Sequence, residues 1–110
     1  MIANPKPRLI FEGGFDERDA FESKARGYRS HVWAELADGE RYPLVFYDAV
    51  RLQQDLQDMT KVGSPYIAES GLIVLQEVTK DNMELAVARL FEEGFFDSLR
   101  PVSEHAGADD

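Results

Sequence analysis

Apolar and polar residues alternate along residues 32–48 (VWAELADGERYPLVFYD), on either side of an Asp-Gly step. This alternation is typical of two strands joined by a hairpin turn. We expect a three-residue loop over 37–39 with Gly39 in the left-handed conformation, because a bulge at a glycine is a common hairpin geometry. In this register Glu35 faces Arg41, and the opposite charges favour the pairing.

This register divides the hairpin into two faces. Even-numbered positions form an almost wholly apolar face: Val32, Ala34, Leu36, Tyr42, Leu44 and Phe46. Odd-numbered positions form a mixed aromatic and charged face: Arg29, His31, Trp33, Glu35, Arg41, Val45 and Tyr47. Because successive side chains of a strand point to opposite sides, we expect the even face to join the core and the odd face to point away from it.

Two later segments have the period of an amphipathic helix. Residues 49–61 place their apolar residues on one stripe behind Asp48, which is a good N-cap residue. The segment after a second N-cap residue, Thr79, has the clearest helical period of the chain. Its apolar residues are Met83, Ala86, Val87, Leu90 and Phe91. Gly63 and Gly94 stand where the two helices should end.

The remaining segments complete one sheet. Residues 8–11 predict a short strand or an apolar strap, and residues 16–24 predict one or two helical turns. Residues 71–78 are apolar on both sides, so we expect a central strand there, placed beside 28–37.

We therefore predict an α+β two-layer sandwich. Its sheet is small and mainly antiparallel, with three or four strands and with two helices on the even-numbered face. The order of elements after an N-terminal arm is strand, strand, helix, strand, helix. We divide the chain into a flexible arm (1–7), a single domain (8–101) and a disordered acidic tail (102–110).

Composition and charge narrow the class of function. The 110 residues carry a net charge of -9, which disfavours a nucleic-acid partner, because such proteins neutralise phosphates with Lys and Arg. No stretch reaches the roughly 20 apolar residues of a membrane span. There is no cysteine, and the N-terminal residues lack the apolar region of a secretory signal, so we expect a cytoplasmic protein without membrane contact.

The sequence contains no residue pattern typical of an active site. The two histidines, His31 and His105, are far apart in the chain and belong to no metal-binding spacing. Ser64 and Ser70 lie outside the sharp turn that presents a nucleophilic serine, and no glycine-rich phosphate loop is present. We expect no catalytic residue, no metal and no cofactor, and we disfavour an enzyme.

The odd-numbered face of the hairpin is the principal candidate for function, because Trp, Tyr and Arg are enriched at interface hot spots. Its candidate residues are Arg29, His31, Trp33, Arg41, Val45 and Tyr47. Three interpretations remain open for this face. In the first, the N-terminal segment covers Trp33 through Leu9, Ile10, Phe11 and Phe15. In the second, the face contacts another protein or a second copy of the chain. In the third, it forms a small-ligand pocket.

Two functions follow from these patterns. The first is a small, acidic, non-enzymatic protein that acts by protein–protein contact or homodimerisation through the outer face of the 28–47 hairpin. The alternative is a small-molecule-binding protein or small enzyme with a site between this hairpin and the loop 60–71, since long loops in small domains are often functional. In that alternative His31 is the base, Tyr47 a donor and Arg41 an anion clamp. The loop contributes Ser64 and Tyr66, although Tyr66 could instead pack under a helix.

Overall fold

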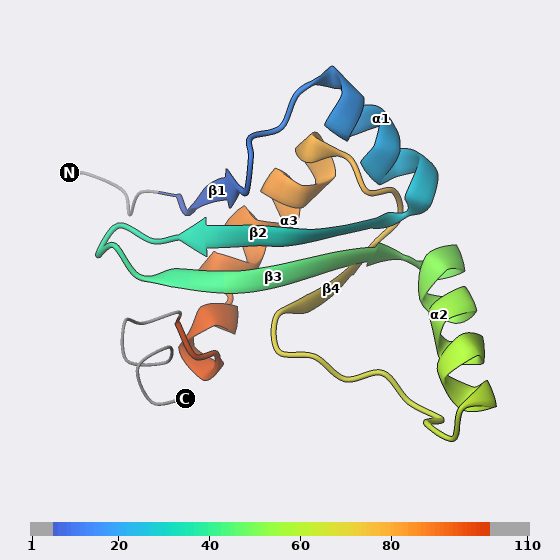
Figure 1. Ribbon diagram of the computed structural model, residues 1–110. Coiled ribbons are helices and arrows are strands. Elements are labelled where there is room, and N and C mark those ends of the chain that lie inside the picture. The colour runs from blue at the N-terminus through green and yellow to red at the C-terminus, as the bar shows by residue number, and fades with distance from the viewer. Residues whose placement is uncertain (1–5, 102–110) are drawn as a thin grey trace.

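The computed structural model describes residues 6–101 and is shown in Figure 1. The elements are β1 (Arg8–Phe11), α1 (Glu17–Arg26), β2 (Tyr28–Glu35), β3 (Arg41–Asp48), α2 (Ala49–Lys61), β4 (Leu72–Leu75), α3 (Lys80–Glu92) and the short 3-10 helix η1 (Phe95–Ser98). The strands form one mixed sheet in the order β1-β2-β3-β4, in which only β4 is parallel to its neighbour. The fold is α+β, as predicted. Most of the predicted arm (1–5) and the tail (102–110) lie outside the described residues.

The β2–β3 hairpin has the predicted register. Glu35 pairs with Arg41, and the backbone N–H of Leu36 donates to the carbonyl of Glu40 at 2.9 Å across the turn. Gly39 has a φ of 88°, in the left-handed region that favours glycine. The even-numbered face is the core face, because Val32, Ala34, Leu44 and Phe46 are buried while Leu36 and Tyr42 pack against them.

One hydrophobic core lies between this face and α3. The helix begins where predicted, because the Thr79 side chain accepts a hydrogen bond from the backbone N–H of Asn82. Its apolar stripe packs on the sheet, with Met83 and Val87 fully buried. In Figure 1, α3 lies behind β2 and β3, and of the described helices only α2 approaches the opposite side, at the end of the sheet where β3 leads into it.

The N-terminal segment extends the sheet and does not cover the outer face. β1 pairs with β2 so that Leu9 and Phe11 point to the core side, where both pack on the core cluster. Ile10 is the residue of this strand that lies beside Trp33 on the outer face. The interpretation in which Leu9, Ile10, Phe11 and Phe15 cover Trp33 is therefore wrong for all but Ile10, because the other three side chains pack on the core side of the sheet. α1, ten residues long, then follows a capping box between Asp16 and Asp19.

β4 lies at an edge beside β3, and not centrally beside residues 28–37 as predicted. The connection through α2 is long enough for a parallel crossover, and such a crossover often places the next strand beside the one it left. The strand is also shorter than expected. Val74 is 49% exposed, because it faces outward from an edge strand.

The helix α2 has the predicted bounds, but it does not cover the core face. Asp48 accepts a hydrogen bond from the backbone N–H of Arg51 at 2.7 Å, as expected of an N-cap. No side chain of α2 is buried, and none joins the core cluster. The helix contacts the outer side of the sheet instead, through Arg51 and Asp55. The core face is already filled by α3 and η1, which explains why only one of the two predicted helices packs on it.

Candidate functional site

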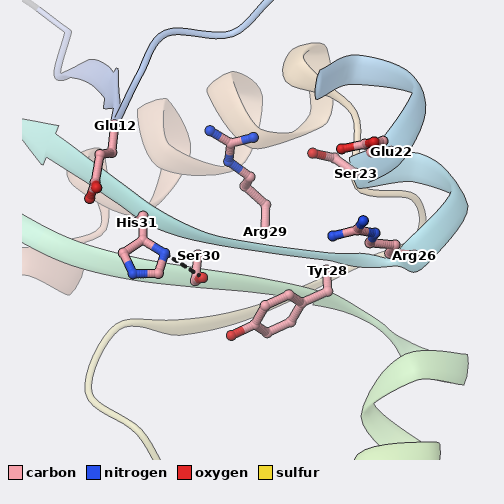
Figure 2. A pocket seen from close by; sticks show the side chains of 8 residues that line it. All are labelled: Glu12, Glu22, Ser23, Arg26, Tyr28, Arg29, Ser30 and His31. Carbon is pink, nitrogen blue, oxygen red and sulfur yellow. Dashed lines mark hydrogen bonds between the residues drawn. The ribbon is translucent and has the colours of Figure 1, made fainter. Parts of the chain in front are cut away.

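A β-bulge in β2 decides which side chains reach the outer face. The register with β3 shifts between Arg29 and Val32, so that Ser30 and His31 occupy the place of one paired residue. His31 has a φ of 58°, an uncommon value for a residue other than glycine. The extra residue reverses the alternation and puts Tyr28 on the outer side. Figure 2 shows Arg29 on one side of the strand and the rings of Tyr28 and His31 on the other.

Arg29 was predicted on the outer face and lies on the core side instead. Its guanidinium carbon is 5.3 Å from the ring centroids of both Phe11 and Phe15, and one of its nitrogens is 3.6 Å from a carboxylate oxygen of Asp19. Arg29 therefore holds the segment between β1 and α1 against the sheet. His31 is exposed on the other side, with its Nδ1 at 3.0 Å from the Ser30 hydroxyl. It lines a shallow cavity of about 270 Å³ at the edge of β2.

The outer face carries a row of charges at the end nearest the hairpin turn. Glu35 accepts hydrogen bonds from Arg8 of β1 and from Arg41 of β3, the latter at 3.0 Å. The hydrogen bond from Arg8, followed by that from Arg41, holds the pKa of the Glu35 carboxyl below its ordinary value. Arg41 is thus occupied by Glu35 and lies at the far end of β3 from Tyr47.

The middle of the outer face and its β4 side carry apolar residues. We name the open patch by its members, which are Ile10, Trp33, Pro43, Leu72 and Val74. Backbone pairing puts the first three side by side across three strands, and Leu72 lies beside the buried Val45. Trp33 is half-buried. In Figure 1 no helix of the described residues lies over the middle of β2 on this side.

An aromatic and charged cluster joins α2 to the other end of this face. The rings of Tyr28 and Tyr47 meet edge to face with centroids 4.9 Å apart, and the Arg51 guanidinium lies 4.8 Å from the Tyr28 ring. The Tyr47 hydroxyl donates to Asp55 at 3.1 Å, and Arg51 Nε donates to the same carboxylate at 2.9 Å. The spacing of Arg51 and Asp55, four apart on a helix, was visible in the sequence, but their contact with the tyrosines was not.

The phenol of Tyr47 gives this cluster a measurable pH dependence. Burial, followed by the hydrogen bond to Asp55, raises the pKa of Tyr47 from 10.0 to about 12. Because the pKa of Tyr47 is higher in the folded than in the unfolded state, the contribution of this phenol to the free energy of unfolding is fully present below about pH 10. That contribution is lost as the pH rises towards 12. We expect the melting temperature of the wild-type protein to fall more steeply between these pH values than that of Tyr47→Phe.

Thermal melts of both proteins at matched ionic strength measure this difference. Tyr66→Phe is the control, because Tyr66 is 66% exposed and its phenol makes no hydrogen bond among the described side chains. This control should keep the wild-type slope. Parallel curves for the wild type and Tyr47→Phe would contradict the buried position of the Tyr47 hydroxyl.

A cavity of about 430 Å³ opens beside Tyr47, between β3, α2 and the strap, which we define as residues 62–71. Its lining residues are Tyr47, Asp55, Asp58, Met59, Ser64, Tyr66, Ile67, Ala68 and Glu69. The structure thus brings together three residues singled out from the sequence: Tyr47, Ser64 and Tyr66. Tyr66 is largely exposed at this cavity, so it does not pack under a helix. His31 and Arg41 do not line it, and the predicted grouping of these two with Tyr47 does not form.

Comparison with protein-family models, with curated proteins and with solved structures finds no match to this chain. Within residues 6–101, no three or more His, Cys, Asp or Glu side chains are grouped so that they could hold a metal ion. No helix in the same part of the chain is long and apolar enough to cross a membrane.

Proposed function

We propose that this protein is a non-enzymatic binding protein that acts through the outer face of the β2–β3 hairpin, and that the partner at this face is a second copy of the chain. The observation that carries the proposal is the open patch, in which the half-buried indole of Trp33 lies between Ile10 and Pro43 on a side of the sheet whose middle no helix of residues 6–101 covers. Contiguous apolar surface with a central aromatic residue is typical of interfaces.

Charge supports self-association at this face. The protein carries a net charge of -9, so two copies repel each other over most approaches. The open patch contains no charged residue, and the row beside it holds two arginines around one glutamate, Glu35. A row with both signs is self-complementary under a two-fold axis, because an arginine of one copy can face the glutamate of the other.

The size of the face indicates a weak dimer. Four strands of four to eight residues, about 4.8 Å apart, offer a footprint below the ~800 Å² per partner of a standard stable interface. We therefore expect a dimer that forms only at high micromolar concentration.

Val74→Lys should weaken this dimer at least about tenfold, because it places a charge on the open patch that the interface would have to desolvate. Sedimentation velocity across a concentration series measures the effect, and the emission maximum of the single tryptophan, Trp33, reports burial of the patch. Leu85→Lys is the matched control. Leu85 is 50% exposed against 49% for Val74, receives the same charge, and lies on α3 away from the outer face.

The control should dimerise as the wild type does. A wild-type protein that stays monomeric at several hundred micromolar would remove the proposal, as would equal weakening by both substitutions.

One observation favours a second function, the binding of a small molecule between the hairpin and the strap. The cavity beside Tyr47 has about 430 Å³, within the roughly 300–1,000 Å³ of ligand pockets. It combines apolar walls with polar groups that converge from three segments of the chain. This arrangement supports the binding of a small molecule.

A further inference from the structure

We infer that the cavity beside Tyr47 binds an organic cation, supplied either as a free amine or as the basic side chain of a polypeptide. This inference rests on the second proposed function, because it names the class of ligand for the same cavity.

The apolar part of the lining suits the body of such a ligand. Met59 and Ile67 provide aliphatic contact, and the rings of Tyr47 and Tyr66 lie on β3 and on the strap. Cations bound over the face of an aromatic ring gain energy from its negative quadrupole. Tyr66 is an exposed ring at the cavity, so it can meet a ligand there without unfolding of the strap.

The charged part of the lining has one sign. The cavity is lined by three carboxylates and by no Lys, Arg or His. Asp55 already accepts from Tyr47 and Arg51, so its charge is largely compensated. Asp58 lies 3.9 Å from Lys61, with both side chains exposed, and a pair of that kind is weak.

Of the three carboxylates that line the cavity, Glu69 is the one that is available to pair with a bound cation. It enters no ion pair within residues 6–101. It lies on the strap close enough to Tyr47 for its charge to help raise the pKa of that phenol, together with the larger effects of burial and of Asp55. The potential at the mouth of the cavity is therefore negative, and the net charge of -9 attracts cations and repels anions at longer range.

The arrangement selects an organic cation over a metal ion. A divalent ion needs several oxygen ligands that converge on one position. The carboxylates of the described residues are not gathered in that way. They are spread around apolar and aromatic walls instead, which matches a ligand that carries its charge on a hydrocarbon body.

Three probes of the same shape test this inference: phenethylamine, phenethyl alcohol and phenylacetate. Titration of the 110-residue protein at pH 7, followed by amide chemical shifts, should show that the amine binds at least about tenfold more tightly than the alcohol, and that phenylacetate binds weakest. Glu69→Gln and Tyr66→Ala should each weaken binding of the amine about five- to tenfold. Glu92→Gln, which removes an exposed carboxylate at the end of α3, should leave it unchanged.

A second pair of probes separates the two sources of the cation. N-acetylarginine methylamide and its uncharged citrulline analogue mimic a basic residue within a polypeptide. Preference for the arginine compound over phenethylamine would assign the cavity to a polypeptide partner, and the reverse preference would assign it to a free amine.

Equal affinity for phenethylamine and phenethyl alcohol would overturn the cation inference and leave small-molecule binding intact. No shift with any probe at millimolar concentration would remove both.

Discussion

Gly71→Ala is expected to destabilise the protein by at least about 3 kcal/mol, because two unfavourable effects coincide at this residue. Gly71 has a φ of 79°, and a β-carbon there would lie 2.2 Å from the carbonyl oxygen of Pro43. The backbone cannot move away freely, since the carbonyl of Gly71 accepts a hydrogen bond from the Val45 N–H at 3.0 Å. Urea denaturation measures the loss of unfolding free energy.

Gly63→Ala is the matched control for this substitution. Gly63 also has a left-handed φ, 95°, but an added β-carbon would meet nothing within 4 Å. Gly63→Ala should lower the free energy of unfolding only by the conformational strain of a left-handed alanine, about 1–2 kcal/mol. The difference between the two variants isolates the close approach of the strap to β3. Equal costs would mean that the strap does not lie against Pro43, and the wall of the cavity beside Tyr47 would then be in question.

The parts of the fold that could be predicted from the sequence depend on local chemistry. The hairpin register follows from a three-residue turn and one pair of opposite charges, Glu35 and Arg41. The starts of two helices follow from Asp48 and Thr79, whose side chains accept hydrogen bonds from the first turn. Each of these features involves residues close in sequence or directly paired, so a pattern of residue types is enough to find it.

The neighbours of β4 and α2 could not be found in this way. An apolar stripe indicates that a helix will bury one side, but it does not say against which surface. The stripe of α2 includes Leu56 and Met59, which remain partly exposed, while polar Arg51 and Asp55 make the contacts with the sheet. The placement of β4 beside β3 depends likewise on the path of the crossover, which hydrophobic periodicity does not encode.

The division of the hairpin into two faces holds only beyond the bulge, where Trp33, Val45 and Tyr47 lie on the outer side, and of these Val45 and Tyr47 are buried. Counting odd and even positions assumes a regular strand, and the extra residue at Ser30 and His31 breaks that assumption. The count therefore placed Arg29 outside and overlooked Tyr28. His is among the residues enriched at positive φ, which is a faint signal in a segment that otherwise has the composition of a strand. The carboxylate of Glu69 was missed because a strap without regular structure gives no rule for the direction of a side chain.

The separation between the core face and the outer face of the sheet leads to the second prediction with a large effect. Phe46→Ala should cost about 3–5 kcal/mol, the usual range for emptying the site of a buried phenylalanine. Phe46 is 0% exposed and lies at the centre of the core cluster, between the strands and α3. Since a small domain has only about 5–15 kcal/mol of stability, urea titrations in the cold are the suitable measurement. Phe46→Leu, with a smaller cavity, provides a milder variant if Phe46→Ala does not fold.

Val74→Ala is the matching truncation on the outer face, so that the two faces of the sheet can be compared. Val74 is half exposed on the outer side, so its truncation should cost about 0.5 kcal/mol or less. Suppose that Phe46→Ala lowers the free energy of unfolding by a large amount and Val74→Ala by a small one. Val74→Lys can then disturb association without disturbing folding. A cost for Val74→Ala close to that of Phe46→Ala would instead show that the outer face is part of the core, and the open patch could then not serve as a contact surface.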